Sequence, residues 1–202
     1  MKKSLLTCVF AITATLMLAQ NDVTKFMGIP VDGYKPEMIK KLQAKGFAYD
    51  SKLDYFRGEF NGHKVILRIV TNNNKVWRIV LVDASMSSET DIKIRFNSLC
   101  RQFEKTGRYM HGAYEGNYII PEDEDISYEM NVNKKRYEAA YMQISESNFE
   151  EYTTISEQEK ERFFKALRQK WVWFMINKSN YREYYISMCY DNMNNEADGE
   201  DL

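Results

Sequence analysis

Few residues in this chain have side chains that could act as nucleophiles or bases. Its 202 residues include two histidines, His63 and His111, and three cysteines, Cys8, Cys100 and Cys189. A nucleophilic cysteine needs a base beside it, and neither histidine stands in a recognisable partner motif. The sequence also lacks the serine-hydrolase elbow, the phosphate-binding loop, the dinucleotide fingerprint and the paired-histidine zinc motif. We therefore predict no enzyme activity, no catalytic residue and no cofactor.

Acidic residues are the other candidates for chemistry. The run Glu122-Asp123-Glu124-Asp125 lies shortly before Glu129. Carboxylates are calcium ligands, but this run lacks the glycine and the terminal glutamate of an EF-hand loop. A solvated acidic loop is the better interpretation, and no metal site is predicted. No two of the 29 acidic residues stand out as a glycosidase pair. An envelope hydrolase is therefore the weakest alternative.

The N-terminus has the pattern of an export signal. Met1-Lys2-Lys3 is basic, and residues 4–19 form a mostly apolar run that is followed by Gln20 and polar residues. We predict a signal peptide at 1–19, a periplasmic or extracellular location, and no transmembrane segment after cleavage. Cleavage leaves 26 basic side chains against 29 acidic ones. Nucleic acid is therefore not an expected partner, because its phosphate backbone is bound by basic excess.

Export places the two remaining cysteines in an oxidising compartment. Cys100 lies on the apolar stripe of an expected helix, and Cys189 lies in an expected strand. Two interpretations stay open with equal weight. The pair forms a disulfide, or both are buried thiols that pack as small apolar side chains.

The elements that would position these residues begin with a helix and a meander. Pro36 suits a first helical turn, and Gly46 suits the end of that helix. Asn61-Gly62 is the strongest hairpin signal in the chain. We predict a first unit at 20–86, with strands at 55–60, 63–70 and 76–82.

The second half starts in the same way. Capping residues at 87–90 precede a helix expected at 91–105, which Gly107 ends. A charged insertion at 145–170 contains Ser156 and Glu159, a capping box that predicts a short helix from about residue 157. We predict a second unit at 87–193, a flexible acidic tail at 194–202, and strands at 126–132, 137–144, 171–177 and 181–191.

A helix followed by a meander, twice, in a small exported protein resembles the beta-lactamase inhibitor protein fold. The same unit occurs singly in outer-membrane assembly lipoproteins of the SmpA/OmlA type. The segment 26–84 also resembles short exported bacterial proteins of unknown function. That resemblance rests on Gly28-Ile-Pro30, Lys35-Pro-Glu-Met-Ile and Asn72-Asn-Asn-Lys-Val-Trp77. It implies an α+β fold of two tandem units, with helices on one sheet face and the other face open. No binding residue is carried over from it.

Strand alternation predicts which side chains lie on the open face. The Asn61-Gly62 turn pairs Phe60 with His63, which puts both under the helix. On the third strand we expect Trp77, Ile79 and Leu81 to point toward the helix as well. The remaining side chains mix arginines with β-branched residues, which is unusual for a merely solvated face.

Aromatic residues are enriched in the second half. Eleven of the fourteen tyrosines follow residue 108. A single ring is more often a core ring, but a core of this size does not easily bury so many phenol hydroxyls without partners. Tyr, Trp and Arg also dominate interface hot spots. The predicted contact set is Tyr55, Arg57, Lys64, Arg68, Arg78, Trp171 and Trp173.

These observations predict an exported, non-enzymatic protein-binding module that uses an open sheet face. Its partner would be an unknown envelope protein, in an inhibitory or assembly role. The alternative is a small-ligand or peptide binder with a cystatin-like pocket between helix and sheet. A homodimer formed through the same face remains open.

Overall fold

The structure is a computed structural model that describes residues 23–112, 117–144, 154–156, 158–160, 170–179 and 183–196. The expected signal peptide at 1–19, most of the charged insertion and the end of the acidic tail lie outside these ranges. Among the described residues, no helix is long and apolar enough to cross a membrane. Ser156 and Glu159 form the expected capping box, in which the Ser156 backbone N–H and hydroxyl both donate to the Glu159 carboxylate. Residues 158–160 are helical, and the remainder of that expected helix lies outside the described residues.

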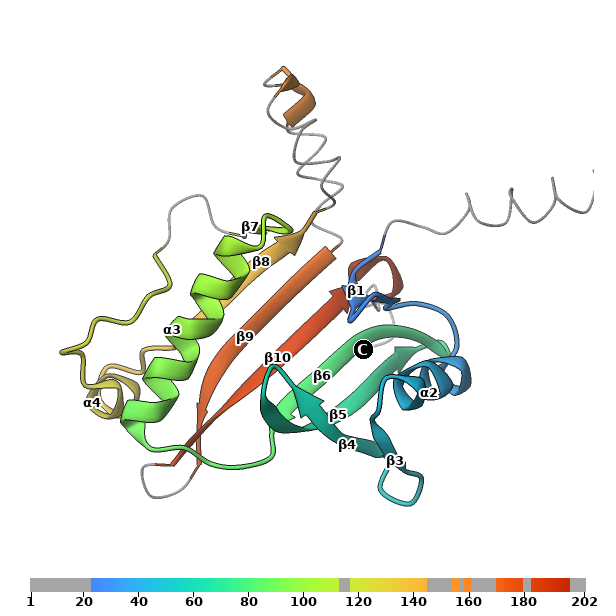
Figure 1. The fold of residues 1–202 in the computed structure, drawn as a ribbon. Coiled ribbons are helices and arrows are strands. Elements are labelled where there is room, and N and C mark those ends of the chain that lie inside the picture. Colours follow the sequence, from blue (N-terminus) through green and yellow to red (C-terminus); the bar gives the residue numbers. More distant parts are fainter. Residues whose placement is uncertain are drawn as a thin grey trace, which may run out of the picture.

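An eight-stranded antiparallel sheet is the main element of the fold (Figure 1). Its strand order is β3-β4-β5-β6-β10-β9-β8-β7, and each strand pairs only with its neighbours in this order. Two shorter strands, β1 (Lys25–Phe26) and β2 (Ile29–Pro30), form a separate hairpin. The strands of the large sheet are β3 (Ala48–Asp50), β4 (Tyr55–Phe60), β5 (His63–Asn72), β6 (Lys75–Asp83), β7 (Tyr109–His111), β8 (Glu138–Gln143), β9 (Lys170–Lys178) and β10 (Tyr184–Asn192).

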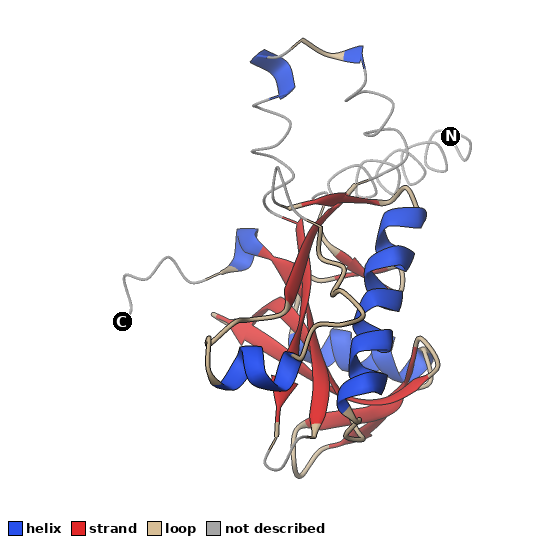
Figure 2. Ribbon diagram, turned by 90° about the vertical axis from the view of Figure 1, so that its left-hand side faces the viewer, coloured by secondary structure: helices blue, strands red, loops and turns tan. Residues whose placement is uncertain are grey.

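Two helices pack on one side of this sheet (Figure 2). Helix α2 (Lys35–Ala44) has proline in its first turn, as expected from Pro36. Helix α3 (Glu89–Lys105) begins after Ser88, whose hydroxyl accepts the backbone N–H of Asp91. A short helix, α4 (Ile126–Asn131), and a 3₁₀ helix, η1 (Met193–Asn195), complete the described elements. The α+β fold class is therefore confirmed.

After the β1–β2 hairpin, α2 is followed by four strands, and α3 is followed by four more, with α4 between β7 and β8. β3 to β6 follow α2 and form one meander, and β7 to β10 follow α3 and form the other. The two meanders join edge to edge through β6 and β10, where Leu81 pairs with Met188. Strands β3 and β7 are short, and the sequence patterns did not predict them.

The strand expected at 126–132 is wrong, because these residues form α4. Asp125 accepts the backbone N–H of Tyr128 and so caps the helix. Ile126 is fully buried and Met130 packs against the core four residues later, which is helical spacing. The same apolar residues satisfy a strand pattern over so short a run, and the cap decides between the two.

The core fills the space between the helices and one face of the sheet. Phe96 of α3 packs edge-on against Phe174 of β9, with ring centroids 5.2 Å apart. Met38 and Leu42 of α2 are at most 1% exposed. Four tyrosines of the second half also belong to this core, so much of the aromatic enrichment serves packing: Tyr137, Tyr141, Tyr184 and Tyr190.

A β-bulge corrects the predicted orientation of one tryptophan. Val70 pairs with Arg78 and Thr71 pairs with Val76, so Trp77 is an extra residue on β6. The bulge turns Val76 into the core, where it is fully buried, and leaves Trp77 partly exposed. The prediction that Trp77 points toward the helix is therefore wrong. The same prediction for Ile79 and Leu81 is correct, since both are buried in the core.

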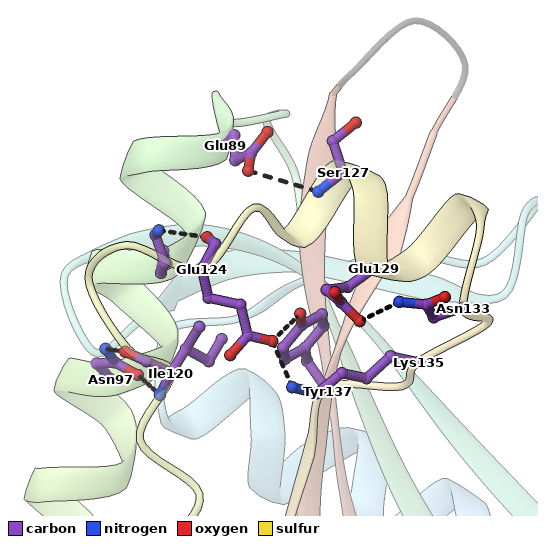
Figure 3. A network of polar contacts seen from close by, with 10 residues as sticks. Glu89, Asn97, Ile120, Glu124, Ser127, Glu129, Asn133, Lys135 and Tyr137 are labelled. Atoms are coloured by element: carbon purple, nitrogen blue, oxygen red, sulfur yellow. Dashed lines mark hydrogen bonds and ion pairs between the residues drawn. The ribbon is translucent and has the colours of Figure 1, made fainter.

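Segment 117–137 is fastened to α3 by a network of polar contacts (Figure 3). Asn97 exchanges two hydrogen bonds of 2.8 Å with the backbone of Ile120. Glu124 accepts hydrogen bonds from both Lys135 and Tyr137. The acidic run thus holds a loop in place. Within the described ranges, no group of three or more His, Cys, Asp or Glu residues is arranged to hold a metal ion.

The two cysteines are free thiols, so the disulfide alternative is wrong. Cys100 is fully buried in the core on α3. Cys189 pairs across the strands with Val80 and Trp173, on the sheet face that points away from the helices. Burial raises the pKa of each thiol to about 12. Both are therefore protonated and behave as small apolar groups.

Candidate functional site: the outer face of the sheet

The strand register defines the sheet face that points away from α2 and α3, which we call the outer face. Its residues form three cross-strand rows that span both meanders. The first row is Arg57–Ile66–Val82–Ser187–Met175–Glu138, the second is Arg68–Val80–Cys189–Trp173–Ala140, and the third is Val70–Arg78–Asp191–Trp171–Met142.

Exposure separates the two faces clearly. On β5 and β6, the core-facing side chains Leu67, Ile79 and Leu81 are at most 2% exposed. Their outer-face neighbours Ile66 and Val80 remain partly exposed. β-Branched residues therefore sit on a surface that the described elements do not bury, as predicted from alternation.

The first meander contributes a basic corner to the outer face. Arg57, Lys64 and Arg68 are all exposed there. Glu59 lies directly opposite Lys64 in the register of the β4–β5 hairpin, so this corner has three basic side chains and one acidic one. Tyr55 does not form part of the accessible surface, because it is only 7% exposed and its hydroxyl accepts a hydrogen bond from Arg57.

The centre of the outer face is an ion pair framed by tryptophans. Arg78 donates to both carboxylate oxygens of Asp191, at 2.6 and 2.7 Å. The indole N–H of Trp173 donates to the same carboxylate at 2.9 Å. The Arg78 guanidinium lies 4.1 Å from the Trp77 ring centroid and 5.4 Å from that of Trp173. We call these four residues the outer clasp.

The carboxylate at the centre of the outer clasp already has its hydrogen-bond partners. Asp191 is only 2% exposed, and its carboxylate receives three hydrogen bonds. The clasp therefore positions aromatic surface, and its carboxylate is not available as a base.

The second meander forms a groove of about 470 Å³ beside the clasp, which we call the tryptophan groove. Two small residues, Gly112 and Ala140, line it together with larger side chains. A Cβ atom on Gly112 would be 2.3 Å from the Trp171 ring, so only glycine allows this ring to pack there. Arg136 and Glu138 form an exposed ion pair of 2.8 Å beside it. The groove is lined by Gly112, Tyr118, Arg136, Glu138, Ala139, Ala140, Trp171 and Trp173.

The outer face therefore brings together most of the residues that the sequence singled out. Arg57, Lys64 and Arg68 occupy one end, Arg78 the centre, and Trp171 and Trp173 the other end. Alternation missed Asp191 because its partner Arg78 lies in the other meander, and no local pattern predicts how β6 pairs with β10. Alternation also gave the wrong orientation for Trp77, because no glycine in the sequence marks the bulge on β6.

The described residues offer no assembled nucleophile. His111 Nε2 lies 3.3 Å from a carboxylate oxygen of Glu104, and its ring stacks on Tyr118. Cys100 is fully buried with a raised pKa, so it is not an activated thiol. His63 is exposed beside the hairpin turn. Its pKa is lowered by partial desolvation and by the charge of Arg95.

Comparison with known proteins gives no relative: no family model, no curated protein and no solved structure matches this chain. The resemblance to the beta-lactamase inhibitor protein fold therefore stays a prediction that rests on element order.

Proposed function

We propose that this chain is an exported, non-catalytic binding protein that holds an acidic partner protein against its outer face. The observation that carries the proposal is the composition of that face. Arginines, β-branched residues and tryptophans share one continuous surface across both meanders, and the apolar members remain partly exposed. Such residues supply large contact areas with polar ends, as interface hot spots do.

Charge favours an acidic partner. Arg57 and Arg68 are exposed on adjacent strands. Glu59 lies opposite Lys64 in the strand register, and Asp191 is bound by Arg78 in the clasp. Complementary charge accelerates association and selects the partner more than it adds affinity. The partner would be either an enzyme that the chain inhibits or a component of envelope assembly.

The test is capture from an envelope extract with the full chain and two charge-reversed variants. Arg57→Glu with Arg68→Glu changes the outer face. Arg78 is left intact, because removing it would leave Asp191 buried without its ion-pair partner. Lys40→Glu with Lys41→Glu is the matched control, since both lysines are exposed on α2. We expect the partner to bind the native chain and the control equally well. Its affinity for the arginine variant should be lower by a factor of about ten or more.

The result must also depend on salt, because exposed charges are screened as ionic strength rises. Equal capture by both variants, or none by the native chain, would contradict the proposal. A captured protein that proves to be a second copy of this chain would replace it with a homodimer. Sedimentation of the purified chain and its arginine variant would then show a dimer and a monomer respectively.

A further inference from the structure

A second, independent recess lies on the helix-covered side of the molecule. Its first part, about 320 Å³, lies between α3 and the β4–β5 turn. Its second part, about 440 Å³, continues past the β1–β2 hairpin to the end of β8. The two parts share five lining residues, so we treat them as one recess, the α3 cleft. The shared residues are Met27, Phe60, Arg108, Tyr109 and Tyr190.

The two ends of the α3 cleft differ in chemistry. The first part is lined by apolar side chains that include Leu99 and Phe103 of α3, and also by polar residues, of which Glu59 is the acidic one. Three basic residues line the second part, Lys25, Arg108 and Lys170, and no acidic residue does so among the described residues. A recess with Leu99, Phe60 and Phe103 in one part and basic residues without an acidic one in the other fits a molecule with a hydrocarbon body and an anionic head. Cavities of this size are typical of small-ligand sites.

The hairpin turn at the cleft carries backbone strain that a comparable turn avoids. Met27 and Gly28 form a two-residue turn with φ values of +49° and +81°. The β4–β5 turn has the same form, with Asn61 and Gly62 at +52° and +76°. Asparagine tolerates this conformation and methionine does so poorly. Strain of this kind persists only where the surrounding structure enforces it, and it clusters at ligand-binding and active sites.

Met27 is the side chain that the strained turn presents. It is 41% exposed, although methionine is a residue that normally packs. It lines both parts of the cleft. A flexible thioether adapts to apolar ligands of different shapes. The turn thus gives up stability to hold an adaptable apolar side chain at the cleft.

We propose that the α3 cleft binds a single-chain amphiphile with an anionic head, of which a medium-chain carboxylate is the simplest member. The hydrocarbon chain lies along Phe60, Leu99 and Phe103 under Met27. The carboxylate lies at the basic end, where the guanidinium of Arg108 can donate two hydrogen bonds to it. This site is on the opposite side of the sheet from the outer face and does not depend on the function proposed for that face.

Calorimetric titration of the full chain with dodecanoate tests the head group. We expect saturable binding to the native chain and about tenfold weaker binding to Arg108→Gln, because one charge-assisted contact is lost. Lys105→Gln is the matched control: this exposed lysine is in the last turn of α3, does not line the cleft, and should keep native affinity. Dodecyl alcohol, which lacks the charge, should bind about tenfold less tightly than dodecanoate.

A second variant tests the role of the strained turn. Met27→Asn should raise the melting temperature or leave it unchanged, since asparagine suits the turn, and should weaken dodecanoate binding severalfold. In the native chain, bound dodecanoate should shift the NMR signal of the Met27 methyl group. No saturable binding, or equal affinity in the native chain, Arg108→Gln and Met27→Asn, would overturn the proposal.

Discussion

Two arginine–aspartate pairs on opposite faces of the sheet show how one kind of contact serves two purposes. Arg95 of α3 binds Asp83 of β6 with two hydrogen bonds, at 2.6 and 3.0 Å, on the helix-covered face. Arg78 binds Asp191 in the same two-pronged way on the outer face. Both aspartates are nearly buried, with side chains 7% and 3% exposed.

The difference lies in the third donor to each carboxylate. Asp83 also accepts the backbone N–H of Ile186, so its pair ties a helix to two strands. Asp191 accepts the indole N–H of Trp173, so its pair ties two strands and orients an aromatic ring. The covered pair therefore secures the layers of the fold, and the outer clasp joins the two meanders while shaping a surface.

Removing the covered arginine should have the largest effect on stability. Arg95→Leu leaves Asp83 buried without its partner, and we expect the free energy of unfolding to fall by about 3–5 kcal/mol. Urea unfolding followed by circular dichroism measures this. Arg101→Leu, an exposed arginine on the same helix, is the control and should change stability little. Equal losses in both variants would mean that the covered pair is not what secures the helix.

Loosening the outer clasp should cost less. Asp191→Asn keeps an acceptor for Trp173 but removes the charge that Arg78 faces. We expect a loss of about 1–3 kcal/mol, smaller than on the covered face because the Arg78 side chain is 24% exposed. Near-ultraviolet circular dichroism should change together with stability, since the clasp fixes two tryptophan rings. Asp123→Asn, in an exposed loop position, is the control.

The same contrast explains what could be predicted from sequence. The β4–β5 hairpin and its register followed from Asn61-Gly62, because a two-residue turn fixes both flanking strands. The basic corner followed from that register. The clasp could not be predicted, because it requires β6 to pair with β10 across more than a hundred residues. The bulge at Trp77 has no local marker in the sequence. The helix at 126–131 does have one, its cap Asp125, which the strand interpretation of the apolar residues after it did not take into account.

Segment 117–137 provides a pH-dependent test of the polar contacts that lie beside α3. Burial acts to raise the pKa of Glu124, but hydrogen bonds from Lys135 and Tyr137 outweigh it and lower the pKa. The carboxylate therefore stabilises the fold fully above the ordinary glutamate pKa, and this stabilisation disappears as the pH falls through the lowered value. Glu124→Gln should lose about 1–2 kcal/mol at neutral pH.

Unfolding of the native chain and of Glu124→Gln at several pH values measures this effect. The difference between them should shrink toward zero in acid. A difference that stays constant with pH would show that the contacts of the amide, rather than the charge, carry the effect. Glu122→Gln, an exposed neighbour in the same run, should show no such dependence.

The smallest expected effect is on the reactivity of the two thiols, which measures the opening of each sheet face separately. Cys100 is fully buried under α3, and Cys189 is 4% exposed on the outer face between Val80 and Trp173. With pKa values raised to about 12, neither should react with a thiol reagent at neutral pH while the chain is folded. A Cys8→Ser background removes the third cysteine from the assay.

Combining the Cys8→Ser background with Asp191→Asn tests whether the outer face and the core under α3 open independently. If the outer clasp holds its face locally, loosening it should speed the labelling of Cys189 severalfold and leave Cys100 unchanged. Equal acceleration at both positions would show that labelling follows global unfolding, so that the two faces open together. Peptide mapping after partial labelling distinguishes these results. Faster reaction at Cys189 alone would mean that the surface proposed to bind a partner can adjust while the core under α3 stays closed.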